Sequence, residues 1–212
     1  MPGIANITVE DFQNRIDRFD QSYVADWNRW IAVQPNQRAT QFGAVLRRWQ
    51  ACRPNRMRRT REEQLHDEPY LEDLINSSGQ YLYALQEFDI RLQTSFTQQA
   101  SDSLVQLWGI FQNLSYHGRA RSGLAGIVGI SKAVLLLTEG RVGPAFDSEV
   151  RTHLGLRRIE NANEWICALQ VASLDIHRFE DANRITLQQA APQQHEGLFS
   201  GRIYDMALGP SG

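Results

Sequence analysis

Hydrophobic residues recur at spacings of three and four through most of the chain, which is the period of one face of an α-helix. The clearest case is residues 7–33, whose apolar stripe consists of Phe12, Ile16, Phe19, Tyr23, Trp27, Trp30 and Ile31. No segment of the sequence alternates convincingly with the two-residue period of a half-buried strand. The pattern therefore predicts an all-α protein of about eight to ten helices.

Further helices are predicted over residues 40–52, 70–88, 101–118 and 159–190, with a last turn in 201–212 that frays toward the end. Pro54 ends the 40–52 helix, and a polar connector over 55–69 enters a helix at a capping box made by Thr60 and Glu63. The segment 70–88 is expected to be broken around Ser78. The apolar face of 101–118 is Leu104, Leu107, Trp108, Phe111 and Leu114.

A length of 212 residues allows one self-sufficient core. We therefore predict a single domain over 1–212. Its N-terminal helical part covers 1–100, a hairpin segment 101–156, and the C-terminal helices 157–212. No internal repeat or low-complexity tract divides the sequence.

The formal net charge of −2 and the pI of about 6.2 give no overall bias toward nucleic acid or membranes, so any anion site must be a local patch. Cys52 and Cys167 are far apart and lack metal-ligand spacing, as do the five histidines. We predict neither a metal nor another cofactor. The first twelve residues lack the features of a secretory signal, and the apolar run 133–137 is too short to cross a bilayer. A cytoplasmic protein without a membrane partner is predicted.

One local basic patch comprises Arg47, Arg48, Arg53, Arg56, Arg58, Arg59 and Arg61. Such a patch can hold phosphates, and Trp49 within it can stack on a base. The alternative is a solvated loop whose arginines pair with the acids that follow it, Glu62, Glu63, Asp67 and Glu68. In that case Trp49, at helical spacing from Phe42 and Val45, belongs to the core.

The segment 123–155 carries the strongest chemical pattern. Lys132 is the only lysine in the sequence, and the other 21 of its 22 Lys and Arg residues are all arginine. We predict a tight glycine-rich turn over 123–129 and a helix from about Ser131, with Lys132 in its first turn. The positive end of a helix dipole favours the neutral amine, which is a nucleophile. Asp147 is predicted to cap the next helix, over 148–155, and to face the same cavity.

The alternative for this segment is an ordinary N-cap at Asp147 and a solvated lysine. The same ambiguity applies to Arg119 and Arg121, which flank the turn. Backbone N–H groups of a glycine-rich turn at a helix N-terminus bind anions, and nearby arginines help. Otherwise the turn is a flexible loop. The spacing of GIVGISK does not match a phosphate-binding P-loop.

The stretches LAGIVGISKA (124–133) and PAFDSEVRTHLGL (144–156) resemble the helix-hairpin-helix DNA glycosylase superfamily. The resemblance implies that Lys132 is the Schiff-base amine and Asp147 the carboxylate that stabilises the sugar cation. For such a protein we expect DNA contacts by Gly126, Gly129, Arg119, Arg121, Arg151, Arg56, Arg58 and Arg59. The chain has Ala125 where the superfamily has proline, and its two glycines are one residue further apart.

Three functional hypotheses follow. The first is a DNA-binding, DNA glycosylase-like repair enzyme that cleaves the N-glycosidic bond of a damaged or modified base, with or without lyase activity through Lys132. The second is a non-catalytic helical module that binds nucleic acid or protein in regulation or host defence. The third is an unrelated helical enzyme. A glycosylase requires Lys132 and Asp147 to face one cleft with the arginines on its rim, whereas a binding module presents an arginine face and leaves Lys132 and Asp147 apart.

Overall fold

The computed structural model describes residues 3–51, 71–114 and 124–212. In these residues the chain forms ten α-helices and four short 3₁₀ turns, η1 (Pro35–Gln37), η3 (Gln93–Ser95), η4 (Gln112–Leu114) and η5 (Gln193–His195). The only extended pairing in the described ranges is one isolated bridge between Phe19 and Ser211. The predicted all-α fold is confirmed. The connector 55–69, with its capping box at Thr60 and Glu63, lies outside the described residues.

The predicted 7–33 helix is two helices, α1 (Val9–Asp17) and α2 (Gln21–Ile31). Asp20 separates them because its carboxylate accepts the backbone N–H of Ser22 at 2.8 Å and caps α2. The apolar stripe nevertheless continues across the break, and Phe12, Phe19 and Trp27 are all buried. Spacing alone did not reveal the break, since a capped junction keeps the same face toward the core.

The middle helices are α3 (Arg38–Arg48), α4 (Leu71–Ala84) and α5 (Gln98–Phe111). The break predicted around Ser78 is wrong. The Ser78 hydroxyl donates to the Ile75 carbonyl at 2.7 Å, so the side chain is satisfied within a continuous α4. The predicted apolar face of α5 is buried, and it packs against α4, α6 and α8.

The C-terminal half contains α6 (Ile127–Leu137), α7 (Ser148–His153), α8 (Ala162–Asn183), α9 (Leu187–Ala190) and α10 (Ser200–Leu208). Arg184, in the left-handed region at φ 55°, ends α8 and separates it from α9. The last turn predicted within 201–212 is a longer helix, α10, and all nine of its residues are buried. A methyl group on Gly201 would meet the backbone of Gly140 and Gly143, so glycine permits this close packing.

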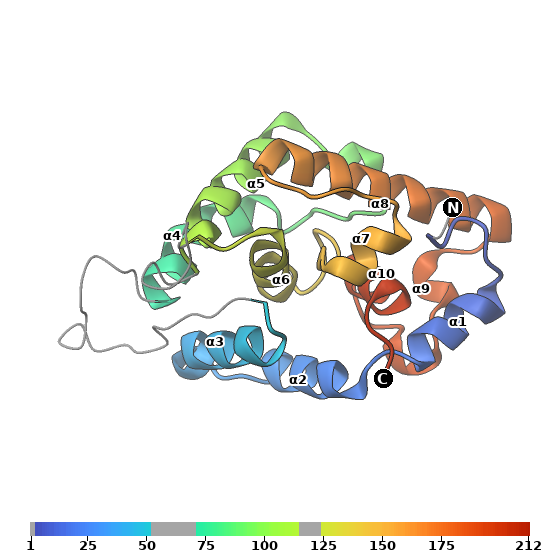
Figure 1. Cartoon of the computed structure of the whole chain (residues 1–212), viewed down its shortest axis with the longest axis horizontal. Helices are drawn as coiled ribbons and strands as arrows, with labels where there is room; N and C mark the ends of the chain where they lie inside the picture. Colours follow the sequence, from blue (N-terminus) through green and yellow to red (C-terminus); the bar gives the residue numbers. More distant parts are fainter. Residues whose placement is uncertain (1–2, 52–70, 115–123) are drawn as a thin grey trace.

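Figure 1 shows α6 and α10 in the middle of the molecule, with α8 along one edge and α2 and α3 along the opposite edge. Buried apolar side chains from Ile4 to Leu208 form one continuous cluster. The central position of α6 and α10 explains why nearly every residue of α6 and all residues of α10 are buried. Any charged residue on these two helices therefore lies inside the protein.

Asp175 on α8 holds the N-terminal segment against α10. Its carboxylate accepts the backbone N–H of Ile4 at 2.7 Å, that of Ala5 at 3.1 Å and the Tyr204 hydroxyl at 2.7 Å. Burial and the Asp175 charge raise the pKa of Tyr204, which keeps the phenol protonated as a donor. One carboxylate thus joins three segments that are far apart in sequence.

We expect Asp175→Ala to lower the free energy of unfolding by about 2–3 kcal/mol, since three donors lose their acceptor. Urea denaturation followed by circular dichroism measures the change. Tyr204→Phe is the matched control, because it removes one of the three bonds and is expected to cost about 1 kcal/mol. Equal effects of the two variants would contradict the shared-acceptor account.

In the part of the chain that the structure describes, no helix combines the length and apolar character needed to cross a membrane.

Candidate functional site

The lysine predicted at the start of a helix lies deeper in it. Helix α6 begins at Ile127 with Gly126 as its N-cap, four residues before the predicted start, so Lys132 is in the second turn. Gly126 is exposed, whereas Gly129 is buried within the helix. Neither glycine has the positive φ of a tight turn. Because Ile127 and Ile130 bury their side chains, residues 127–129 form the first turn of α6 and not a loop.

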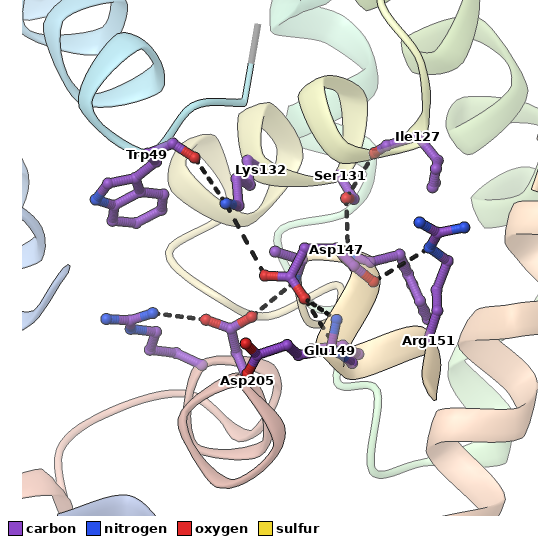
Figure 2. Close-up of polar contacts among 12 residues, drawn as sticks. Trp49, Ile127, Ser131, Lys132, Asp147, Glu149, Arg151 and Asp205 are labelled. Carbon is purple, nitrogen blue, oxygen red and sulfur yellow. Dashed lines mark hydrogen bonds and ion pairs between the residues drawn. The ribbon is translucent and has the colours of Figure 1, made fainter. Parts of the chain in front are cut away.

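Lys132 is 3% exposed and has three neighbours of complementary character. Its Nζ donates to the backbone carbonyl of Trp49 at 2.9 Å and lies 4.0 Å from Asp147 Oδ2. The same nitrogen lies 5.2 Å from the centroid of the Tyr23 ring. Figure 2 shows the amine between the end of α3 and the start of α7. The solvated lysine of the alternative interpretation is therefore wrong.

Asp147 caps α7, as predicted, and faces Lys132 with its second oxygen. Oδ1 accepts the backbone N–H groups of Glu149 at 3.1 Å and Val150 at 3.0 Å. Oδ2 remains directed at Lys132 (Figure 2), and the side chain is 17% exposed. The capping bonds hold the carboxylate on a helix end, so its distance from the amine is set by the packing of α7 against the centre of the molecule.

The loop before Asp147 is held from both sides. The Ser131 hydroxyl donates to the Ile127 carbonyl at 2.7 Å and accepts the backbone N–H of Phe146 at 2.9 Å. Asp205 on α10 accepts the N–H of Ala145 at 2.9 Å. These bonds are buried, and they tie the residues next to Asp147 to the residue next to Lys132. The amine and the carboxylate consequently belong to one rigid unit.

We expect Ser131→Ala to lower the free energy of unfolding by about 1–2 kcal/mol, because the buried Phe146 N–H loses its acceptor. Ser103→Ala on α5 is the matched control: that hydroxyl is also buried and donates to the carbonyl four residues earlier, at 2.9 Å. Its loss leaves no loop N–H unpaired and is expected to cost less than half as much. Thermal and urea denaturation measure the stability of both variants. A larger loss of unfolding free energy for Ser103→Ala than for Ser131→Ala would contradict the role of Ser131 in holding the loop.

A second buried ion pair lies beside the first. Arg202 is 1% exposed and donates to Asp205 at 2.6 Å, and its guanidinium carbon lies over the rings of Phe19, Trp27 and Trp49. Burial raises the pKa of Asp205, and the Arg202 charge partly opposes that rise. Burial likewise lowers the pKa of Arg202. Desolvation is thus the main cost of placing this pair in the core.

Tyr23 on α2 lies between Lys132 and Trp49, the residue that ends α3. Its ring stacks on Trp49 with centroids 5.2 Å apart. Burial raises the pKa of Tyr23, and the negative charge of Asp147 raises it further. The phenol is therefore neutral near pH 7 and lies within the electrostatic reach of the Lys132–Asp147 pair.

Of the remaining predicted site residues, those that the structure describes do not direct their side chains at this pair. Arg151 folds back on α7, where its Nε donates to the Asp147 carbonyl at 3.1 Å (Figure 2). Arg48, from the basic patch, pairs with Asp26 at 2.7 Å, and Trp49 is in the core. Five of the predicted DNA contacts, Arg56, Arg58, Arg59, Arg119 and Arg121, lie outside the described residues.

Sequence reasoning missed Ser131, Tyr23, Arg202, Asp205 and the carbonyl of Trp49. One signal was available, since Arg202 and Asp205 are three residues apart in an otherwise apolar stretch, GRIYDMAL. Charged residues at that spacing share a helix face. The others depend on contacts between helices distant in sequence, so no local pattern marks them.

Comparison of the chain with protein-family models, with curated protein sequences and with solved structures found no match. The chemistry of the site therefore has to be argued from its own geometry.

Proposed function

We propose that this chain is a DNA glycosylase-like protein that binds DNA and acts on the N-glycosidic bond of a damaged or modified nucleotide. The observation that carries the proposal is the 4.0 Å separation of Lys132 Nζ, on α6, and Asp147 Oδ2, at the N-cap of α7. A buried hydrogen bond joins the residues next to them, Ser131 and Phe146. At 4.0 Å the two groups form an ion pair and not a direct hydrogen bond, and they can act on one sugar, with the amine as nucleophile and the carboxylate as the group that stabilises positive charge.

In the proposed reaction the nucleotide leaves the base stack, because its C1′ atom is otherwise inaccessible. The bond from C1′ to the base breaks, and its electron pair leaves with the base, which takes up a proton. The Asp147 carboxylate stabilises the positive charge that develops on the sugar. The neutral Lys132 amine then forms a bond to C1′, a proton moves from its nitrogen to O4′, and cleavage of the C1′–O4′ bond opens the ring and leaves a protonated Schiff base.

Burial of Lys132 has a consequence for this chemistry. The amine must exchange the Trp49 carbonyl for the sugar carbon, and the helix ends around it must open enough to admit the sugar. Phosphate contacts are assigned to Arg151, to the backbone of the exposed Gly126 at the N-cap of α6, and to Arg119, Arg121, Arg56, Arg58 and Arg59. Gly129 is buried within α6, so no phosphate contact is assigned to it.

The test is borohydride trapping on duplex DNA that carries one abasic site, which requires no knowledge of the base. We expect a covalent protein–DNA adduct that maps to Lys132 by mass spectrometry. An intact duplex of the same sequence and a reaction without borohydride are the controls. Absence of an adduct at protein concentrations that saturate DNA binding would overturn the lyase chemistry.

A specific observation supports one other function. Lys132 is 3% exposed and bonds a backbone carbonyl, which is the behaviour of a lysine that ties α3 to α6. A non-catalytic helical module that binds nucleic acid or protein needs the lysine only for that purpose. DNA binding without an adduct, together with a lower melting temperature when Lys132 is replaced, would favour this module.

A further inference from the structure

Helix α8 presents exposed apolar side chains on the outside of the molecule. It is the longest helix in the described ranges, and Figure 1 shows it along one edge. Val171 is 40% exposed and Leu174 is 45% exposed. They are three positions apart and so share one face of the helix. No other helix of the described chain has two exposed large apolar residues, which makes this face the strongest candidate for a protein contact.

Charged residues continue this face in both directions at the same helical spacing. The resulting α8 stripe consists of five exposed residues, Glu164, Cys167, Val171, Leu174 and Arg178. Steps of three and four residues make a narrow seam of the kind along which two helices pack side by side. The stripe has a negative end, an apolar centre and a positive end, so it has a direction.

The α8 stripe is complementary in charge to a second copy of itself that runs in the opposite direction. Glu164 lies seven residues before Val171, and Arg178 lies seven residues after it. At 1.5 Å per residue, each charge is about 10 Å from Val171 along the helix. A twofold axis at Val171 therefore places Glu164 of each copy opposite Arg178 of the other. In a parallel pair the like charges would lie opposite one another, which is unfavourable.

The other polar contacts of α8 are compatible with this pairing. Glu164 Oε2 accepts the backbone N–H of Glu160 at 2.7 Å, which holds the carboxylate at the start of the helix. Neither Glu164 nor Arg178 forms an ion pair with another residue that the structure describes. The exposed Asp181 would lie opposite Asn161, which is uncharged. The antiparallel arrangement thus brings no like charges together within α8.

We propose that the α8 stripe is the contact between two copies of this chain, which pair antiparallel about a twofold axis at Val171. Val171 and Leu174 form the buried centre of the contact, and Glu164 and Arg178 set its direction. The apolar centre is small, so we expect a weak dimer with a dissociation constant on the order of 100 µM. Lys132 and Asp147 belong to other helices, and the inference does not rest on the proposed function.

Sedimentation velocity of the full chain, under reducing conditions and at concentrations on both sides of the expected dissociation constant, tests for the dimer. Val171→Glu places two carboxylates at the axis and is expected to raise the dissociation constant about tenfold or more. Val105→Glu on α5 is the matched control, because Val105 is also a helical valine and is 39% exposed. It is expected to leave the dissociation constant unchanged. A wild-type chain that stays monomeric would overturn the proposal in favour of a different protein partner, and equal effects of the two substitutions would also overturn it.

Charge reversal tests the direction of the pair. Glu164→Arg and Arg178→Glu each place like charges opposite one another and are expected to raise the dissociation constant about fivefold. The double variant keeps the net charge of the wild type and again places opposite charges together, so it is expected to restore the wild-type dissociation constant. Circular dichroism and melting temperatures establish that all three variants are folded. A double variant that dimerises no better than either single variant would overturn the antiparallel arrangement.

Disulfide cross-linking tests the position of the axis. The sequence has two cysteines, and Cys52→Ser/Cys167→Ser removes both. Val171→Cys in this background places the sole cysteine at the axis, and mild oxidation is expected to give a covalent dimer. Val105→Cys in the same background is the control and is expected to remain monomeric. Cys52→Ser alone leaves Cys167, which would lie about 12 Å from its copy along the helix direction, beyond the reach of a disulfide. Faster cross-linking through Cys167 than through position 171 would overturn the assigned axis.

Discussion

Replacement of Lys132 with methionine is expected to abolish the borohydride-trapped adduct on abasic DNA. Lys132 is the only lysine in the sequence, so the variant has no other side-chain amine that can form a Schiff base. Methionine is unbranched and of similar length, which preserves the packing of the aliphatic stem inside α6. Loss of the trapped adduct would therefore result from the missing nitrogen and not from a packing defect around α6.

The same variant carries a stability prediction that serves as its control. The Trp49 carbonyl loses its donor and Asp147 loses its cation, whereas the cost of burying the ammonium disappears. We expect a net loss of about 1–2 kcal/mol in the free energy of unfolding, small enough for the protein to remain folded in the assay. An adduct of wild-type yield in Lys132→Met would remove Lys132 from the chemistry.

Replacement of Arg202 with methionine is expected to lower the free energy of unfolding by about 3–5 kcal/mol, because it leaves the Asp205 carboxylate buried without its counter-charge. The guanidinium is 1% exposed and also contacts three aromatic rings. Urea denaturation of wild type and variant at pH 7.5 measures the difference.

Arg29→Met is the matched control, since Arg29 pairs with Asp26 at the same three-residue spacing but its side chain is 65% exposed. Surface pairs contribute less than about 1 kcal/mol, and Asp26 keeps Arg48 as a partner. The double variant Arg202→Met/Asp205→Asn is expected to recover part of the loss, because the amide has no charge to bury and still accepts the Ala145 N–H. A loss in Arg202→Met no larger than in Arg29→Met would contradict the account.

The loss of unfolding free energy caused by Arg202→Met is expected to be larger at neutral pH than at acidic pH. Burial already raises the pKa of Asp205, and Arg202 is the group that opposes this rise most. Without Arg202 the folded-state pKa rises further, while the unfolded-state value is unchanged. The folded variant then favours the protonated acid, so its stability deficit is largest at neutral pH and shrinks as the pH falls through the folded-state pKa. Denaturation at pH 7.5 and pH 5 is expected to show the smaller deficit at pH 5.

Local patterns were sufficient for some features of this protein. The three-to-four spacing predicted helices over most of the described chain, and the N-cap at Asp147 followed from an aspartate after a proline-containing loop. Where a predicted turn was wrong, packing against other segments outweighed the local preference of the residues for a turn. The two glycines in 126–129 favour a turn, yet residues 127–129 are helical. The reason is that burial of Ile127 and Ile130 stabilises the helix more than the glycines favour a turn.

Residue spacing along the chain was enough to predict the helical class, the apolar stripe from Phe12 to Trp27, and a segment that holds one amine and one carboxylate. The burial of Lys132 against the Trp49 carbonyl, and the buried Arg202–Asp205 pair beside it, depend instead on contacts between distant helices. The reason is that helix periodicity and capping depend on residues within a few positions of one another. The surroundings of a central helix such as α6 are supplied by α5 and by α2 and α3, whose hydrogen bonds to Leu136 and Lys132 span 106 and 83 residues of the chain.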